Sequence, residues 1–196
     1  MSALMPDQHL LAAVDLGSNR FLLLIGRVES TEVGEQIRPL DALKESVRLA
    51  AGLGPDGQLD AASQTRAIEA LSRFGERLRS FGPDQVRAVA TNTFRVARNS
   101  RRLLRTAQAA LGFPIEVISG HEEARLIYLG ASHALPSDDR QRIVVDIGGG
   151  STECIIGRNY EPVRLESTAI GCVTLSEQFF PGGAVDASSF ERACFA

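Results

Sequence analysis

The sequence predicts an α/β protein made of two related domains that face each other. Short apolar segments typical of strands alternate with longer segments in which apolar residues recur every three or four positions, as in helices. This alternation is typical of layered α/β folds. In addition, an apolar strand that leads into an aspartate and a glycine-containing turn occurs twice, at Asp15 and at Asp146. A duplication of this kind indicates two related units.

The first half begins with a strand, a tight turn and a second strand. The apolar run Leu10–Asp15 leads into the turn residues Gly17, Ser18 and Asn19, and the second apolar run Phe21–Val28 follows directly. The elements expected after these are a strand at 36–47, a helix at 60–81, a strand at 86–91, a helix at 97–111, a strand at 115–118 and a helix at 122–133.

A polar linker at 136–139 separates the two halves, and the pattern of strands then restarts. Strands are expected at 143–145, 153–157 and 162–168. The sequence therefore predicts a first domain over residues 1–135 and the start of a second domain over residues 140–196. Because few helices would cover the second sheet, we expect this domain to be incomplete and to leave apolar side chains uncovered, namely Ile143, Val145, Ile155 and Val163.

Composition excludes several classes of function. The net charge of −3 and the pI of about 5.7 give no basic footprint for nucleic acid. Lys44 is the only lysine, which excludes a GK[ST] phosphate loop, where a lysine reaches the terminal phosphates. No apolar run approaches the roughly 20 residues of a membrane span. The three cysteines include no CxxC pair, and no basic residue precedes the first apolar run. We therefore expect a cytoplasmic protein with no membrane span.

The segment 146–153 combines a glycine-rich turn with acidic residues. Three consecutive glycines at 148–150 let the backbone approach a ligand closely and turn several N–H groups toward it, which favours anion binding. Ser151 adds a hydroxyl donor, and Asp146 and Glu153 supply carboxylates of the kind that Mg²⁺ prefers beside phosphate. Asp15 and residues 17–19 would form the matching half-site. The alternative is a pair of plain hairpin turns.

The segment 119–125 predicts a helix start with one carboxylate that has no structural task. Ser119 and Glu122 fit the S-x-x-E capping box, in which the glutamate folds back onto the start of the helix. Glu123 has no such role, so it could orient or deprotonate a water molecule. The alternative is that Glu123 only favours the positive end of the helix dipole, and the sequence leaves both open.

An arginine-rich segment follows the strand at 86–91. Arg95 lies beside Thr91 and Thr93 at the predicted junction of strand and helix, which makes it a candidate phosphate ligand. Further arginines recur at helical spacing and would share one face, either to follow a polyanion or as a solvated surface. They are Arg98, Arg101, Arg102 and Arg105.

Five segments carry a resemblance to one family. They are residues 13–19, 87–98, 119–130, 146–153 and 171–174, and they run in order over almost the whole chain. Together they resemble the exopolyphosphatase / guanosine pentaphosphate phosphatase family (Ppx/GppA), and Phe179–Gly183 is more similar to the exopolyphosphatase branch. Two features depart from the family. Arg20 stands where a serine is usual, and family members continue well beyond residue 196.

The resemblance implies the actin-like ATPase fold, which is ribonuclease H-like, with phosphates held between two domains. It implies that Glu123 is the general base and that Asp146 and Glu153 hold Mg²⁺, with Mn²⁺ as an alternative. It also implies a set of phosphate-binding residues: Asp15, Gly17, Ser18, Asn19, Thr93, Arg95, Gly148, Gly149, Gly150, Ser151 and Cys172.

The activity that the resemblance implies is hydrolysis of the terminal phosphoanhydride of inorganic polyphosphate, with release of orthophosphate. Two alternatives stay open, namely hydrolysis of guanosine pentaphosphate and an inactive module that binds polyphosphate or an alarmone. A kinase-like ATPase on the same fold would need an adenosine-binding segment that this sequence does not show. We therefore expect a phosphate-chain ligand and no nucleic acid, and a homodimer is one expected assembly.

Overall fold

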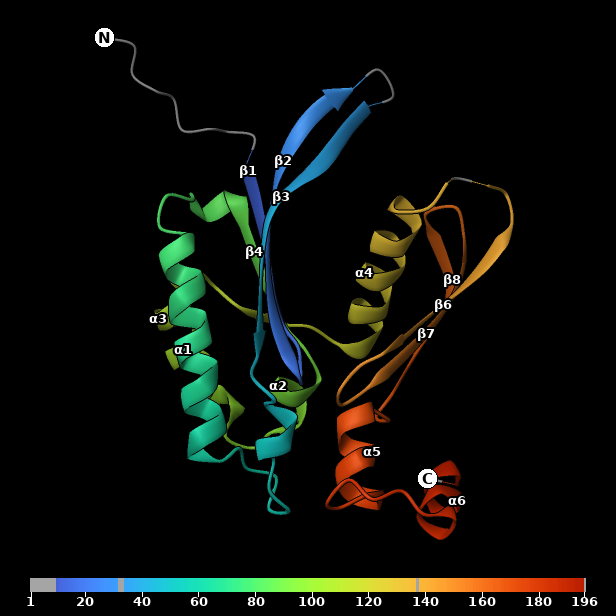
Figure 1. The fold of residues 1–196 in the computed structure, drawn as a ribbon. Coiled ribbons are helices and arrows are strands. Elements are labelled where there is room, and N and C mark those ends of the chain that lie inside the picture. The colour runs from blue at the N-terminus through green and yellow to red at the C-terminus, as the bar shows by residue number, and fades with distance from the viewer. Residues whose placement is uncertain (1–9, 32–33, 137, 196) are drawn as a thin grey trace.

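The computed structural model describes residues 10–31, 34–136 and 138–195, which form two lobes side by side (Figure 1). The first lobe contains a five-stranded sheet with the strand order β3-β2-β1-β4-β5. Strands β1 to β3 pair antiparallel, whereas β4 pairs parallel with both β1 and β5. The strands are β1 (Leu10–Leu16), β2 (Arg20–Thr31), β3 (Gly34–Ser46), β4 (Val86–Ala90) and β5 (Glu116–Val117).

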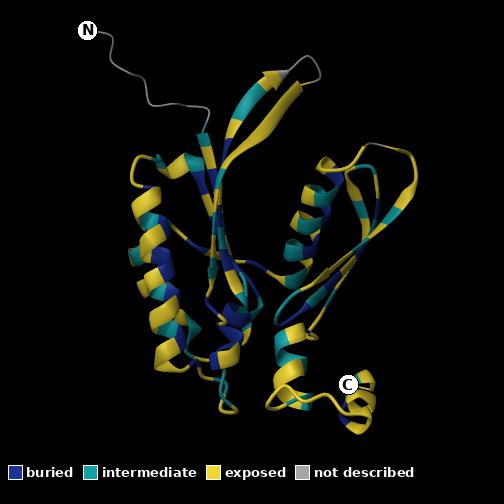
Figure 2. Ribbon diagram, in the orientation of Figure 1, coloured by how far each residue is buried: buried dark blue, intermediate teal, exposed yellow. Residues whose placement is uncertain are grey.

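Two helices cover one face of the first sheet and form the main core with it (Figures 1 and 2). Every second residue of β1, including Val14 and Leu16, is buried on this face. Because side chains alternate along a strand, Asp15 lies on the opposite face of the sheet. The helices and 3₁₀ turns of this lobe are η1 (Ala50–Gly52), α1 (Ala61–Arg77), η2 (Pro83–Gln85), α2 (Asn92–Val96) and α3 (Ser100–Leu111).

The predicted helix at 97–111 is wrong at its start, because the chain forms α2, a short link and then α3. Long-range hydrogen bonds fix this link. The Arg98 N–H donates to the Gly57 carbonyl (2.9 Å), and the Asn99 side chain exchanges two hydrogen bonds with the backbone of Leu59. Arg98 therefore lies outside the helix, and the four arginines do not form a single helical stripe.

The second lobe is a three-stranded antiparallel sheet with the order β6-β7-β8, covered on one face by α4. Although α4 follows β5 in the chain, it packs against the second sheet, with Ala124, Tyr128 and Ile155 buried between them (Figure 1). The predicted domain division between residues 135 and 140 stays a prediction. The elements are α4 (Gly120–His133), β6 (Gln141–Ile147), β7 (Thr152–Arg158) and β8 (Glu161–Thr168).

The other face of the second sheet is open to solvent. As expected, Ile143, Val145 and Val163 are uncovered, with exposed fractions of 68%, 51% and 65%. The expectation for Ile155 is wrong, because its side chain points to the opposite face and is fully buried against α4. Figure 2 shows the resulting contrast, in which buried residues fill the first lobe and are few in the second.

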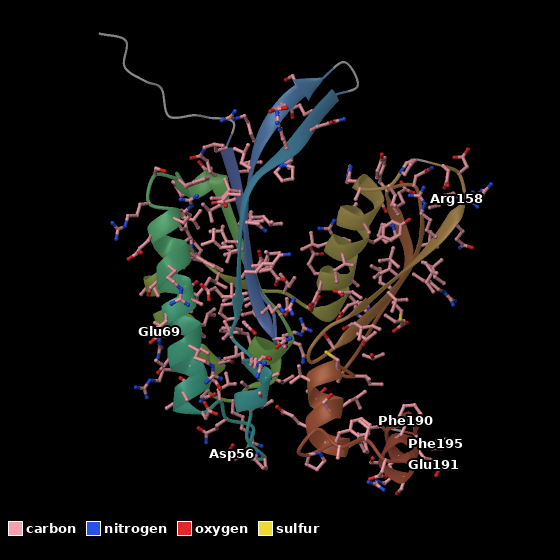
Figure 3. The ribbon with its side chains drawn as sticks, viewed as in Figure 1. Asp56, Glu69, Arg158, Phe190, Glu191 and Phe195 are labelled. Carbon is pink, nitrogen blue, oxygen red and sulfur yellow. The ribbon has the colours of Figure 1, made fainter. Side chains whose placement is uncertain are left out.

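Two short helices follow the second sheet, α5 (Cys172–Phe179) and α6 (Ala187–Cys194). The former contacts η1 of the first lobe, so the lobes touch at this end of the molecule. The latter lies at the far end of the second lobe, where Phe190 and Phe195 are exposed (Figure 3). Within the described ranges, we find no helix with the length and apolar character needed to cross a bilayer.

Candidate functional site

The two glycine-containing turns meet between the lobes and line a cleft of about 240 Å³. The β1–β2 turn supplies one wall, the β6–β7 turn supplies the other, and α4 contributes one carboxylate. Arg20, which departs from the family pattern, also lines this cleft. The predicted site residues that the structure brings together here are Asp15, Gly17, Ser18, Asn19, Glu123, Asp146, Gly148, Gly149, Gly150, Ser151 and Cys172.

The first turn is fixed by the core of its own lobe. Ser18 is only 6% exposed, and its Oγ accepts a hydrogen bond from the Thr93 hydroxyl (2.8 Å). The backbone is held as well, because the Ser18 carbonyl accepts from the Ala50 N–H (2.9 Å) and the Asn19 carbonyl accepts from the Arg48 N–H (2.7 Å). Buried polar groups that are satisfied in this way make a rigid wall.

The second turn is held by the start of α5. The Gly148 carbonyl accepts a hydrogen bond from the Cys172 N–H (2.9 Å), and the Gly149 carbonyl accepts from the Val173 N–H (3.0 Å). Gly171 allows this approach, because a Cβ at that position would overlap the backbone of Gly149. Cys172 therefore lies at the cleft because its own backbone anchors the turn.

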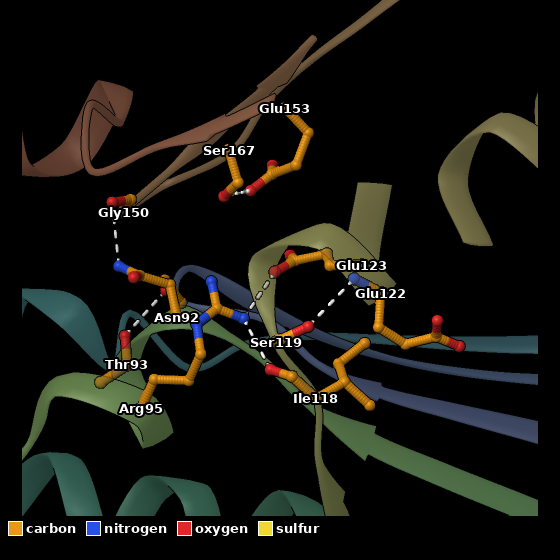
Figure 4. A network of polar contacts seen from close by, with 11 residues as sticks. Asn92, Thr93, Arg95, Ile118, Ser119, Glu122, Glu123, Gly150, Glu153 and Ser167 are labelled. Atoms are coloured by element: carbon orange, nitrogen blue, oxygen red, sulfur yellow. Dashed lines mark hydrogen bonds and ion pairs between the residues drawn. The ribbon is translucent and has the colours of Figure 1, made fainter. Parts of the chain in front are cut away.

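A hydrogen bond at Gly150 joins the two lobes. The Asn92 side chain donates a hydrogen bond to the Gly150 carbonyl (2.9 Å), which links α2 of the first lobe to the second turn (Figure 4). A Cβ on Gly150 would overlap the Asn92 amide and lie 3.1 Å from Ser18 Oγ. Glycine is therefore required here for close approach of the backbone.

Glu123 lies in the first turn of α4 and lines the cleft. Its carboxylate accepts a hydrogen bond from Arg95 Nη1 (2.8 Å), which also donates to the Ile118 carbonyl (3.0 Å) (Figure 4). Burial raises the pKa of Glu123 above its ordinary value. Arg95 opposes this increase and the nearby Glu153 carboxylate adds to it. A carboxylate whose pKa is raised in a cleft is suited to accept a proton from water.

The capping box at the start of α4 is confirmed for Ser119 and wrong for Glu122. Ser119 Oγ accepts from the Glu122 N–H (3.2 Å), as expected for an N-cap. The Glu122 carboxylate instead forms two bonds to Arg125 (2.7 and 2.8 Å), which lower the pKa of Glu122. A bidentate arginine is a stronger partner than one backbone N–H. Glu122 therefore forms an ion pair on the surface of α4 and does not cap the helix.

Asp15 and Asp146 line opposite walls of the same cleft. Loss of hydration raises the pKa of Asp15 to about 6, and repulsion from the Asp146 carboxylate contributes to the increase. The Asp15 side chain is still accessible to water at the mouth of the cleft. Because the two carboxylates repel each other, a cation placed between them would be stabilised by both.

Glu153 pairs with Asp146 in the β6–β7 register, but it is only 1% exposed and accepts a hydrogen bond from the Ser167 hydroxyl (2.8 Å). Among the described residues, no group of three or more His, Cys, Asp or Glu side chains could hold a metal. The donor set of Asp15 and Asp146 fits Mg²⁺, which uses one or two carboxylates and takes its other ligands from water and phosphate oxygens.

Three predicted site residues lie just outside the cleft lining: Thr93, Arg95 and Glu153. Each of them contacts or pairs with a residue that does line the cleft. Thr93 bonds to Ser18, Arg95 pairs with Glu123, and Glu153 lies across the strand pair from Asp146.

Two residues of the site were missed by the sequence analysis. Asn92 is the second residue after β4, whose carboxyl end lies beside that of β1, and its position between Thr91 and Thr93 is the signal that could have found it. Ser167 carries no such signal, because its partner Glu153 lies on a neighbouring strand.

The Ppx/GppA phosphatase family matches residues 27–195 of this chain. The chain belongs to that family. The match covers most of both lobes, and it confirms the family that the five sequence segments resemble.

Two solved structures of this family are similar to the chain. A Ppx/GppA enzyme from Aquifex aeolicus has 28% sequence identity and a TM-score of 0.74, and the similarity covers 94% of this chain and 60% of that one. An exopolyphosphatase from Cytophaga hutchinsonii has 30% identity and a TM-score of 0.77, covering 87% of this chain and 54% of that one. This Ppx/GppA chain therefore spans between 54% and 60% of the length of these two relatives.

A more distant structure shows the fold alone. The PilM–PilN complex of type IV pilus biogenesis contains a chain with 12% identity and a TM-score of 0.55, and the similarity covers 93% of this chain and 68% of that one. The Ppx/GppA chain has the actin-like ATPase fold that the resemblance implied.

Proposed function

We propose that this chain is an exopolyphosphatase that removes the terminal phosphate of inorganic polyphosphate in the cytoplasm. The observation that carries the proposal is the arrangement of one cleft. The backbone of the Gly148–Gly150 turn lies opposite the Ser18 turn, and Glu123 faces the space between them. This arrangement supports a site that combines a phosphate cradle with a proton acceptor. The related exopolyphosphatase from Cytophaga hutchinsonii supports this choice of substrate.

The chemistry assigns each wall a task. The glycine turn and the hydroxyls of Ser18 and Ser151 hold the terminal phosphate, so that charge developing on it meets fixed donors. Glu123 takes a proton from a water molecule whose oxygen forms a bond to the terminal phosphorus. The bond from phosphorus to the bridging oxygen breaks, and its electron pair stays on the shortened chain. Orthophosphate and a chain shorter by one unit result.

Negative charge must be neutralised for this reaction, since substrate and site are both anionic. Asp146, with Asp15 opposite and the buried Glu153 behind it, would hold Mg²⁺ or Mn²⁺, which supplies positive charge beside the phosphate oxygens. Burial is the main cause of the raised pKa of Asp15, and repulsion from Asp146 adds to it. This repulsion supports the assignment, because a cation is favoured between two carboxylates that repel each other.

The test compares phosphate release from two substrates. We expect the chain, supplied with Mg²⁺, to release orthophosphate from polyphosphate faster than from guanosine pentaphosphate. Faster release from guanosine pentaphosphate would replace the proposal with that alternative. Tight binding of either compound without release would indicate a binding module. Glu123→Gln is the control in each assay, because it should remove release and retain binding.

A further inference from the structure

A second cavity lies beside the contact between Asn92 and Gly150, and Asn92 is part of its lining. Its volume is about 220 Å³, and we refer to it as the rear cavity. It shares Ser151 with the main cleft, but Asp15, Glu123 and Asp146 line the main cleft and not the rear cavity. The residues that matter for its chemistry are Asn92, Arg95, Gly120, His121, Ser151 and Ser167.

Arg95 connects the two spaces. Its Nη1 atom makes the bonds to the Ile118 carbonyl and to Glu123, so the Nε and Nη2 atoms carry no bond to any residue in the described ranges. Nη2 lies on the side of Gly120, since a Cβ built there would be 3.8 Å away from it and would also overlap Ser167 Oγ. The unused part of the guanidinium group therefore faces the rear cavity (Figure 4).

The walls of the rear cavity suit a small anion. The guanidinium fork matches the spacing of two phosphate oxygens, and Ser151 places a hydroxyl donor on the wall that belongs to the second lobe. The Ser167 hydroxyl lies on the same wall but donates to Glu153. Gly120 and His121 begin α4, where backbone N–H groups add a partial positive charge. A cavity of this size has room for one phosphate ion, whereas a nucleoside needs more space.

We propose that the rear cavity binds inorganic phosphate and is the route by which the product leaves. This inference rests on the proposed function for its second part. In the hydrolysis described above, the attacking water lies on the Glu123 side of the terminal phosphate. The phosphate that forms therefore moves toward Glu123 and Arg95, while the shortened chain stays in the main cleft.

Proton transfer would itself make Arg95 available. While Glu123 is ionised, its carboxylate neutralises the guanidinium charge at a distance of 2.8 Å. Once Glu123 has taken the proton from water, its carboxyl group is neutral and no longer compensates the positive charge of Arg95. A phosphate dianion then becomes the favoured partner of Arg95. Binding of product in the rear cavity is thus coupled to completion of the chemical step.

The experiment measures binding of inorganic phosphate to the whole chain by calorimetry, without turnover. Glu123→Gln imitates the protonated carboxyl, so it should bind phosphate about tenfold more tightly or better, as expected for one released charged hydrogen bond. Glu122→Gln is the matched control, since its carboxylate pairs with Arg125 on the surface, and phosphate affinity should stay unchanged. Equal affinity in Glu123→Gln and the unsubstituted chain would overturn the coupling to Arg95.

A second pair of variants locates the ion. His121→Glu places a carboxylate at the rear cavity, and Cys172→Glu places the same group at the main cleft. Because like charges repel, His121→Glu should weaken phosphate binding about tenfold or more, and it should weaken it more than Cys172→Glu does. The reverse order would place the ion in the main cleft and overturn the proposal.

The two proposals can fail separately. If polyphosphate is not hydrolysed but His121→Glu still weakens phosphate binding, the rear site stands and the proposed activity does not. If hydrolysis is confirmed, orthophosphate should inhibit it without competing with polyphosphate, and His121→Glu should remove this inhibition. Purely competitive inhibition would contradict an exit through the rear cavity.

Discussion

The Asp15 turn and the Asp146 turn lie on opposite walls of one cleft, and each follows a strand that ends close to an aspartate. Their supports differ. The first turn is held within its own lobe, by the buried side-chain pair of Ser18 and Thr93 and by backbone bonds from Arg48 and Ala50. The second turn is held by the backbone N–H groups at the start of α5 and by the Asn92 side chain, which comes from the other lobe. The same sequence pattern is therefore stabilised in two different ways.

The difference has a chemical consequence. The first turn exposes the Ser18 hydroxyl to the cleft. The second turn has no side chains over Gly148–Gly150, so its backbone N–H and carbonyl groups line the cleft instead. A surface of side-chain donors on one wall and main-chain donors on the other can contact a phosphate from two sides. The aspartates complete the symmetry, because one carboxylate from each turn lines the cleft.

The largest effect should come from removing the cation that the two aspartates are proposed to share. With a chelator in excess, phosphate release from polyphosphate should fall below detection, since a bound metal is worth several kcal/mol of transition-state stabilisation. Addition of Mg²⁺ or Mn²⁺ should restore it. Full turnover in chelator would mean that the aspartates do not act as a metal pair and that arginine alone balances the charge.

Neither turn carries the proton acceptor, so loss of Glu123 should reduce turnover more than loss of any single donor in a turn. We expect Glu123→Gln to lower the rate of hydrolysis about 10²- to 10⁴-fold, the usual range for a general base. Binding of polyphosphate should persist. Glu122→Gln serves as the comparison and should cost helix stability of about 0.5 kcal/mol or less, since it removes only an exposed ion pair with Arg125. Equal loss of rate in both variants would remove Glu123 from its role.

The close approach of the two turns can be tested at Gly150. A methyl group there would overlap Asn92 and crowd Ser18, so Gly150→Ala should destabilise the fold by about 1–3 kcal/mol, as overpacking does. Gly130→Ala is the control, because a Cβ at this exposed helical position meets nothing within 4 Å. That change should stabilise α4 by about 0.5–1 kcal/mol. Urea unfolding of both variants measures the difference, and destabilisation by both would argue against a specific contact.

Features that depend on local spacing could be predicted from the sequence. The Asp15 and Asp146 turns, the strands around them and the N-cap at Ser119 all follow from short patterns. The lining of the cleft shows that the two turns and Glu123 are brought together, whereas the predicted capping role of Glu122 is wrong because Arg125 binds its carboxylate. Strand ends that carry an aspartate into a glycine turn have few structural alternatives.

Features that depend on a partner far along the chain could not be predicted. The packing of α4 on the second sheet is decided by Tyr128 and Ile155, which are adjacent only in the folded structure. The break before α3 depends on the bonds between Asn99 and Leu59. The prediction for Ile155 is wrong for the same reason. Strand periodicity identifies the two faces of a strand but does not say which face a helix covers.

The smallest effect concerns Asp15 alone, in the absence of metal. Its pKa is raised from 3.8 to about 6 in the folded chain, so the folded state holds a proton between these values that the unfolded state has lost. The free energy of unfolding should therefore fall as pH rises from about 4 to 6, and stay lower above that range. Asp15→Asn should remove this part of the pH dependence and be more stable than the unsubstituted chain at pH 7. Water reaches the Asp15 side chain, so the gain in stability of Asp15→Asn should be smaller than the full pKa shift implies.

Asp41 provides the opposite case. Its bond to Arg77 lowers its pKa, so its contribution to the stability of the folded chain is lost as pH falls. Urea unfolding at several pH values with chelator present compares Asp15→Asn with the unsubstituted chain. Equal slopes for Asp15→Asn and the unsubstituted chain would show that the pKa of Asp15 is not raised in the folded chain.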